Sequence, residues 1–190
     1  MRINITGNIV YGLFLSSVLG LVPLNAADTR SIPIDVNLIV DGSSALKEPL
    51  DEVAAWISNN LVDHLFQEGD KVTIWSAGRS ARIVYSDTLK DGAWKDNVKN
   101  SLKSLSAGDD SADFAGALRE AAGRGSGGNM TYTLLVSGSS ASLSPTLLGS
   151  GANLMKYSRI EEFRGWRILV IALNIDSRVR QAAAAYFSNS

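Results

Sequence analysis

The chain has no cysteine and only one histidine, His64, so it lacks the side chains for a disulfide, a thiolate metal site or an imidazole cluster. Its fold must therefore be held by a hydrophobic core alone. It also lacks an excess of either charge, because 18 basic and 19 acidic residues give a formal net charge of −1. This balance gives no reason to expect binding to nucleic acid or to an acidic membrane surface.

Charge is nearly absent from residues 1–26, where Arg2 is the single charged residue. The segment includes an apolar run from Ile9 to Leu24. Tyr, Gly and Ser interrupt this run, which is typical of a secretory signal and poor for a membrane-spanning helix of roughly 20 apolar residues. We therefore predict a signal peptide at 1–26, a linker at 27–33 and one domain at 34–190, with no membrane insertion once the signal is cleaved. An uncleaved anchor is the alternative. Export without cysteine favours a bacterial periplasm or cell surface, or secretion.

Short apolar runs alternate with segments of helical period along the rest of the chain. A tight hairpin through Ala77-Gly78 is predicted. In the first predicted helix, the stripe of apolar residues that ends at Leu65 should face the core of the protein. Trp56 lies opposite that stripe and is predicted to be exposed. The predicted strands are 34–41, 71–76, 79–85, 131–136 and 166–173, and the predicted helices are 46–67, 94–105, 114–121, 145–163 and 178–187.

This alternation indicates crossover connections between parallel strands. The predicted fold class is α/β: a doubly wound, mainly parallel, Rossmann-like sheet with one antiparallel edge hairpin and helices on both faces. In such a sheet, ligands bind at the carboxyl ends of the strands.

Three segments at those strand ends carry a family resemblance. A strand ends in "VDGSS" at Asp41–Ser44, a loop and helix read "SADFAGALREA", and a later strand ends in "LLVSG" at Ser137. Together with the order of elements, they resemble the von Willebrand factor type A (vWA) domain family over about Ile34 to Ser177. The resemblance implies a module of adhesion or protein assembly, often with a divalent metal at the top of the sheet. Family members usually continue past this region into a sixth strand and a closing helix, and this domain is expected to lack that pair. The sheet edge left open is expected to permit oligomers.

The metal site that the resemblance implies is incomplete here. The family motif needs Asp-x-Ser-x-Ser, a Thr and a second Asp, but this chain has Ala45, Ala112 and Ser137 at three of those five positions. Only Asp41 and Ser43 remain. Because Mg²⁺ needs several placed oxygens and negative charge, we expect no cofactor, or at most weak Mg²⁺ or Ca²⁺ binding.

A shift of one residue would bring Ser111 to the Thr position, so any metal set would be Asp41, Ser43 and Ser111. The simpler interpretation is that Asp109, Asp110 and Asp113 form a solvated loop that caps the following helix. Asp41 and Ser43 also have a structural role available, in which they bind free amides and hold neighbouring loops together.

Catalytic motifs fail on inspection. A nucleophile elbow at Ser43-Ser44 would need Gly in place of Leu46 and a nearby base, but His64 should lie about 30 Å along the first helix. Aspartyl phosphate chemistry would need a carboxylate at position 43. The glycine-rich stretch 123–129 follows a helix, unlike a phosphate-binding loop. We therefore predict no enzyme activity.

The predicted function is an exported, non-catalytic binding module of vWA type with a decayed metal site, whose partner is another protein. The alternatives are a metal-dependent vWA adhesion domain and a hydrolase of unrecognised mechanism. The residues predicted to contact the partner are Asp41, Ser43, Ser44, Asp110, Ser111, Asp113, Ser137 and Ser139.

Overall fold

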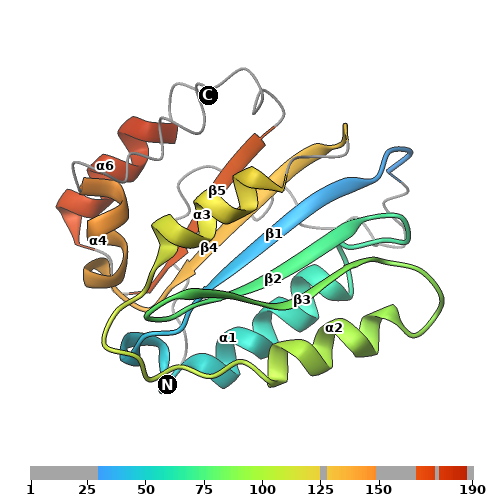
Figure 1. The fold of residues 1–190 in the computed structure, drawn as a ribbon, viewed down its shortest axis with the longest axis horizontal. Coiled ribbons are helices and arrows are strands. Elements are labelled where there is room, and N and C mark those ends of the chain that lie inside the picture. Colours follow the sequence, from blue (N-terminus) through green and yellow to red (C-terminus); the bar gives the residue numbers. More distant parts are fainter. Residues whose placement is uncertain (1–29, 125–127, 149–165, 174–175, 188–190) are drawn as a thin grey trace, which may run out of the picture.

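The computed structural model describes residues 30–124, 128–148, 166–173 and 176–187 (Figure 1). The predicted signal peptide and most of the predicted helix at 145–163 lie outside the described residues. In chain order the elements are β1 (Ile34–Asp41), the 3₁₀ turn η1 (Ser44–Leu46), α1 (Leu50–Ile57), the π turn η2 (Ser58–Val62), β2 (Lys71–Ala77), β3 (Ala81–Thr88), α2 (Trp94–Lys103), α3 (Phe114–Gly123), β4 (Met130–Ser137), α4 (Ser140–Leu148), β5 (Trp166–Ala172) and α6 (Ser177–Phe187).

The described strands form one sheet in the order β3-β2-β1-β4-β5, in which β2 and β3 are antiparallel and the other neighbours are parallel. The predicted mainly parallel sheet with an antiparallel edge hairpin is thereby confirmed. The strand order reverses between β1 and β4, which lie side by side in the middle of the sheet. Such a reversal creates a crevice at the carboxyl ends of the two strands, where α/β proteins usually bind their ligands.

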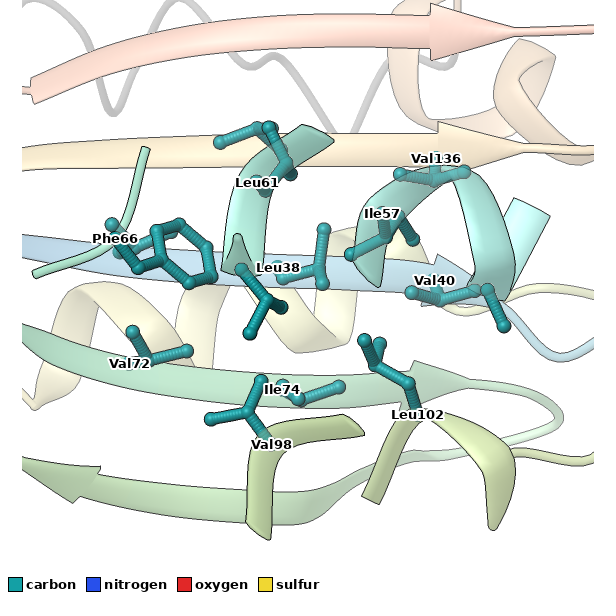
Figure 2. Close-up of a cluster of buried hydrophobic side chains, with 14 of the residues drawn as sticks. Leu38, Val40, Ile57, Leu61, Phe66, Val72, Ile74, Val98, Leu102 and Val136 are labelled. Carbon is teal, nitrogen blue, oxygen red and sulfur yellow. The ribbon is translucent and has the colours of Figure 1, made fainter. Parts of the chain in front are cut away.

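Helices cover both faces of the sheet: α1 and α2 lie on one side and α3, α4 and α6 on the other (Figure 1). Each central strand therefore buries both of its faces, which is why β1 is an almost continuous apolar run. Adjacent residues Leu38 and Ile39 belong to the two different core clusters, and both side chains are fully buried. Figure 2 shows the larger cluster, where Leu38 and Ile74 of the sheet pack with Ile57 of α1 and Leu102 of α2.

The segment predicted as one helix over 46–67 is broken in three. A 3₁₀ turn precedes Pro49, which stands at the N-cap of α1, and a π turn follows α1. In the π turn the Asp63 amide donates to the Ser58 carbonyl, five residues back. The wider turn shifts the helical register, so that Phe66 is buried and Leu65 is 40% exposed, contrary to the predicted stripe.

Smaller boundaries also differ from the predictions. The β2–β3 hairpin turns at residues 78–80 rather than through Ala77-Gly78. Helix α4 begins at Ser140, earlier than Pro145. Trp56 is half-buried against the α1–α2 core rather than exposed, so it is not a free contact residue.

Candidate functional site

The candidate site lies at the carboxyl ends of β1 and β4, where the strand order reverses. Asp41 is the last residue of β1, and Ser137 is the last residue of β4. We call this region the loop end; it consists of residues 42–45 after β1, the hairpin turn 78–80, the α2–α3 loop at 104–113 and residues 138–139 after β4. The sequence prediction that the polar residues converge at this edge of the sheet agrees with these positions.

The Asp41 carboxylate is the centre of the loop end. Its side chain is buried, with 1% of the residue exposed. One oxygen accepts the Ser43 amide at 2.8 Å, and the other accepts the Gly138 amide at 2.9 Å and the Ser137 hydroxyl at 3.3 Å. These donors come from the loops after both β1 and β4, so a single carboxylate joins two segments almost a hundred residues apart.

A network of serine hydroxyls continues from Asp41 to the start of α4. The Ser43 and Ser142 hydroxyls are 3.1 Å apart, and the Ser142 hydroxyl lies 3.2 Å from that of Ser139. The Ser137 hydroxyl also contacts the Ser139 carbonyl, at 3.0 Å. Because Ser43, Ser137 and Ser142 are buried, their hydroxyls bond within the protein rather than to solvent.

Main-chain hydrogen bonds fasten the remaining loops to this centre. The Gly42 amide donates to the Ala77 carbonyl at 2.7 Å, while the Gly42 carbonyl accepts the amides of Gly108 and Asp109. The Ser44 amide donates to the Asp109 carbonyl at 2.8 Å, so residues 43 and 109 pair as in a short parallel bridge. Four separate loops therefore hold a fixed arrangement that does not depend on exposed side chains.

Two glycines make this close packing possible. A Cβ on Gly138 would lie 2.5 Å from the backbone carbon and oxygen of Ala45, and a Cβ on Gly42 would lie 2.9 Å from the Gly78 Cα. Real Cβ atoms do not approach backbone atoms so closely, so a side chain at either position would separate the loops.

The structure divides the eight predicted contact residues into two groups. Asp41, Ser43 and Ser137 are buried within the loop end, where they bond to one another and to the surrounding loops. That these three residues contact the partner stays a prediction. The residues that remain at the surface are Ser44, Asp110 and Ser111, which are exposed, and Asp113 and Ser139, which are half-buried.

The acidic loop before α3 has the structural role expected of it. The Asp113 carboxylate accepts the Gly116 amide at 2.8 Å and thus caps α3. Asp109 accepts the Arg79 amide at 2.9 Å, and Asp110 pairs with the Arg79 guanidinium at 3.0 Å. These carboxylates bind protein donors of the hairpin and of α3.

Sequence reasoning missed Arg79 and Arg82 of the hairpin, and the pairing of Ser142 with Ser43. The signal for the arginines was available, because β2 is parallel to β1 and the turn after β2 must reach the same edge of the sheet. The pairing of Ser142 with Ser43 could not be found from sequence, because it depends on the start of α4 lying over the β1 turn.

In the part of the chain that the structure describes, no group of three or more His, Cys, Asp or Glu residues is arranged to hold a metal ion. None of the helices in that part has both the length and the apolar character needed to cross a membrane.

The structure does not bring Ser44 and His64 together. Ser44 is exposed at the loop end, whereas the exposed His64 follows η2, where the chain returns to begin β2. The start of β2 lies at the edge of the sheet opposite the loop end, because β1 and β2 are parallel.

Comparison with known proteins identifies the fold. No family model and no curated protein matches the sequence. Among solved structures, a von Willebrand factor type A protein from Catenulispora acidiphila aligns over 82% of this chain and 37% of its own, with 14% identity and a TM-score of 0.62. Proximal thread matrix protein 1 from the mussel byssus aligns over 80% and 41%, with 12% identity and a TM-score of 0.61.

The ArnB paralog VWA2 from Sulfolobus acidocaldarius aligns over 83% of this chain and 40% of its own, with 13% identity and a TM-score of 0.56. This chain thus spans only about two fifths of the length of these three structures. At such low identities the likeness shows the fold alone.

Proposed function

We propose that this chain, whose fold is of the vWA type, is an exported protein-binding module that acts without catalysis and without a resident metal ion. The observation that carries the proposal is the state of the Asp41 carboxylate, whose two oxygens accept three hydrogen bonds from the protein. A buried anion satisfied in this way holds loops in place and needs no cation.

The donor chemistry of the loop end supports the absence of a tight dication site. Mg²⁺ requires near-octahedral oxygen coordination and keeps its waters unless several anionic ligands are placed around it. The buried part of the loop end offers one carboxylate, that of Asp41, together with serine hydroxyls. The third position of the family's first motif is Ala45, and Ser111 is exposed on its loop.

The proposed contact surface is formed by the exposed polar side chains of the loop end. Ser44, Asp110 and Ser111 stand on loops whose main chains are mutually hydrogen-bonded. A rigid frame with short polar side chains loses little conformational entropy on binding, which favours specific recognition of another protein. An ordinary transient interface of this kind would bury on the order of 1,200 Å² or less.

Export is proposed from the sequence of residues 1–26, which has the apolar run and low charge of a secretory signal. The absence of cysteine fits a protein that passes through an oxidising compartment without forming disulfides. Proteolytic mapping of the N-terminus of the protein recovered from its native cells tests this part of the proposal: a mature chain that begins near residue 27 supports it, and one that retains residues 1–26 in the cytoplasm contradicts it.

Site-specific photo-crosslinking in the native cells tests the binding surface. A photoreactive residue at position 44 should capture a discrete protein partner, whereas the same residue at Lys90, exposed at the opposite end of the sheet, should not. The Ser44 adduct should form equally with and without EDTA. Loss of the adduct with EDTA would favour the metal-dependent adhesion domain, and equal labelling from both positions would contradict a binding role for the loop end.

A further inference from the structure

The loop end also holds an open groove of about 420 Å³, whose lining does not include the polar centre around Asp41. Its walls come from the turn after β1, the β2–β3 hairpin and the α2–α3 loop. We call it the arginine groove, because Arg79 and Arg82 of the hairpin both line it; Gly42, Gly78, Gly108 and Asp109 are among its other lining residues.

Glycine backbone keeps the arginine groove open. Gly42 and Gly78 meet so closely that a Cβ on Gly42 would lie 2.9 Å from the Gly78 amide nitrogen and Cα. At Gly108, by contrast, a Cβ would meet nothing within 4 Å. The groove therefore has a floor of tightly packed main chain and an unobstructed side at Gly108 through which a ligand group can enter.

The guanidinium groups at the groove are only loosely engaged. The Arg79 and Asp110 side chains are 76% and 88% exposed, and an ion pair so open to water contributes little and exchanges readily. Arg82 donates to the Ser106 hydroxyl at 3.1 Å and forms no ion pair within the part of the chain that the structure describes.

The acidic groups that face these arginines from the neighbouring loop are Asp109 and Asp110. One carboxylate oxygen of Asp109 accepts a hydrogen bond from the Arg79 main-chain amide, at 2.9 Å. Asp109 is therefore held in place by the main chain and does not occupy the Arg79 guanidinium. Asp110 is the removable partner. A competing anion can therefore replace Asp110 at Arg79 and pair with Arg82 without disturbing the frame of the loop end.

We propose that the arginine groove binds an acidic segment of a protein partner by a side-chain carboxylate. The inference rests on the proposed function and names the chemistry of the partner. Guanidinium forks bind carboxylates through two parallel hydrogen bonds, which gives both strength and orientation. The hydroxyl and main-chain groups that surround the arginines suit a polar ligand, and the open side at Gly108 admits a side chain carried on an extended segment.

Peptide selection on the purified protein tests the proposal. A displayed library of random seven-residue peptides, selected at 50 mM NaCl, should yield sequences enriched in Asp or Glu, and replacing that acid by its amide should abolish binding. Arg82→Gln should weaken the selected peptides at least about tenfold, the size expected for a charge-assisted hydrogen bond in a partly enclosed site. Raising the salt should weaken binding in the wild type.

Substitutions at glycine supply matched controls. Gly108→Glu places a carboxylate at the open side of the groove and should abolish peptide binding, whereas Gly108→Gln should reduce it much less. Gly92 likewise has nothing within 4 Å of its Cβ position and lies outside the groove, so Gly92→Glu should bind as the wild type does. Unchanged tryptophan fluorescence would show that each variant is folded.

The opposite results would overturn the inference. Selected peptides without acids, or acidic peptides that bind Arg82→Gln and Gly108→Glu as well as the wild type, would exclude the arginine groove as their site. Binding of inorganic phosphate with the same dependence on Arg82, in the absence of acidic peptide binding, would assign the groove to a different anion. If the crosslink from position 44 persists in Gly108→Glu at full yield, the binding module stands and the carboxylate site fails; if no crosslink forms in the wild type, the proposed function fails first.

Discussion

Replacing Asp41 by alanine should destabilise the protein through two stranded amides. The substitution removes the acceptor of the Ser43 and Gly138 amides, while the Ser137 hydroxyl keeps its bond to the Ser139 carbonyl. A buried donor without a partner costs about 1–3 kcal/mol. For the two amides together we expect a net loss of stability of about 2–4 kcal/mol, because the variant no longer buries a charge and this offsets part of the cost. For a chain of this length that loss corresponds to a fall in Tm of roughly 5–15 °C.

Asp41→Asn is the controlled version of the same experiment. It keeps one carbonyl oxygen and the side-chain shape, so it should cost about 1–2 kcal/mol, between the wild type and the alanine variant. Urea unfolding followed by tryptophan fluorescence and circular dichroism measures all three proteins. The reasoning is refuted if Asp41→Ala lies within about 0.5 kcal/mol of the wild type, or if Asp41→Asn is more stable. Either result would mean that the Asp41 carboxylate does not stabilise the loop end as described.

Three further outcomes are expected. Adding 10 mM MgCl₂ should change the Tm of wild type and Asp41→Ala equally and by less than about 1 °C, since a site with a Kd of 0.1 mM would add about 2.7 kcal/mol to the wild type alone. Gly138→Ala should lower stability by about 1–3 kcal/mol, because its Cβ would press against the Ala45 backbone. Gly108→Ala should be neutral within about 0.5 kcal/mol. Equal free energies of unfolding for the two variants would contradict the packing described. The Lys99 ammonium, 2.7 Å from Asp63, lowers the pKa of that half-buried carboxyl from its ordinary value of 3.8, so its stabilisation is present above about pH 4 and is lost as the pH falls through the folded-state pKa. Asp63→Asn should therefore show a shallower loss of stability in acid titrations below about pH 4.

The strands and the layer arrangement could be predicted because their signals are local. An almost continuous apolar run such as that of β1 has no solvated face, which already places helices on both sides of the sheet. The regular recurrence of Val98 and Leu102 located α2 in the same way. Element order then limited the topology, since parallel neighbours need crossovers.

The first helix shows where periodicity fails. A regular period of 3.6 assigned Leu65 to the core, but one turn of five-residue hydrogen bonding at Ser58–Val62 carries Phe66 there instead. Nothing in the sequence of that segment distinguishes a π turn from an α turn, and in the folded protein η2 packs against α2. Pro49 could mark a first turn but could not reveal that a separate 3₁₀ turn precedes it.

At the loop end, the sequence identified which strand ends would meet but not which side chains would be covered. Asp41 and Ser43 looked like contact residues because they are polar and follow a strand. Their burial depends on the approach of Gly138 from β4, a contact between residues 97 apart in the chain. Exposure at a junction of loops is a property of the assembled edge, and the individual segments do not encode it.

The pairing of residues 43 and 109 has a consequence for how this edge of the molecule can change. Because amides and carbonyls supply the bonds between the turns, exchanging Ser44 or Asp110 for another residue removes none of these main-chain links. Substitutions at the exposed positions 44, 110 and 111 can therefore change what the loop end recognises without changing the main-chain hydrogen bonds beneath them. Engineered libraries at these three positions should retain the fold of the parent protein.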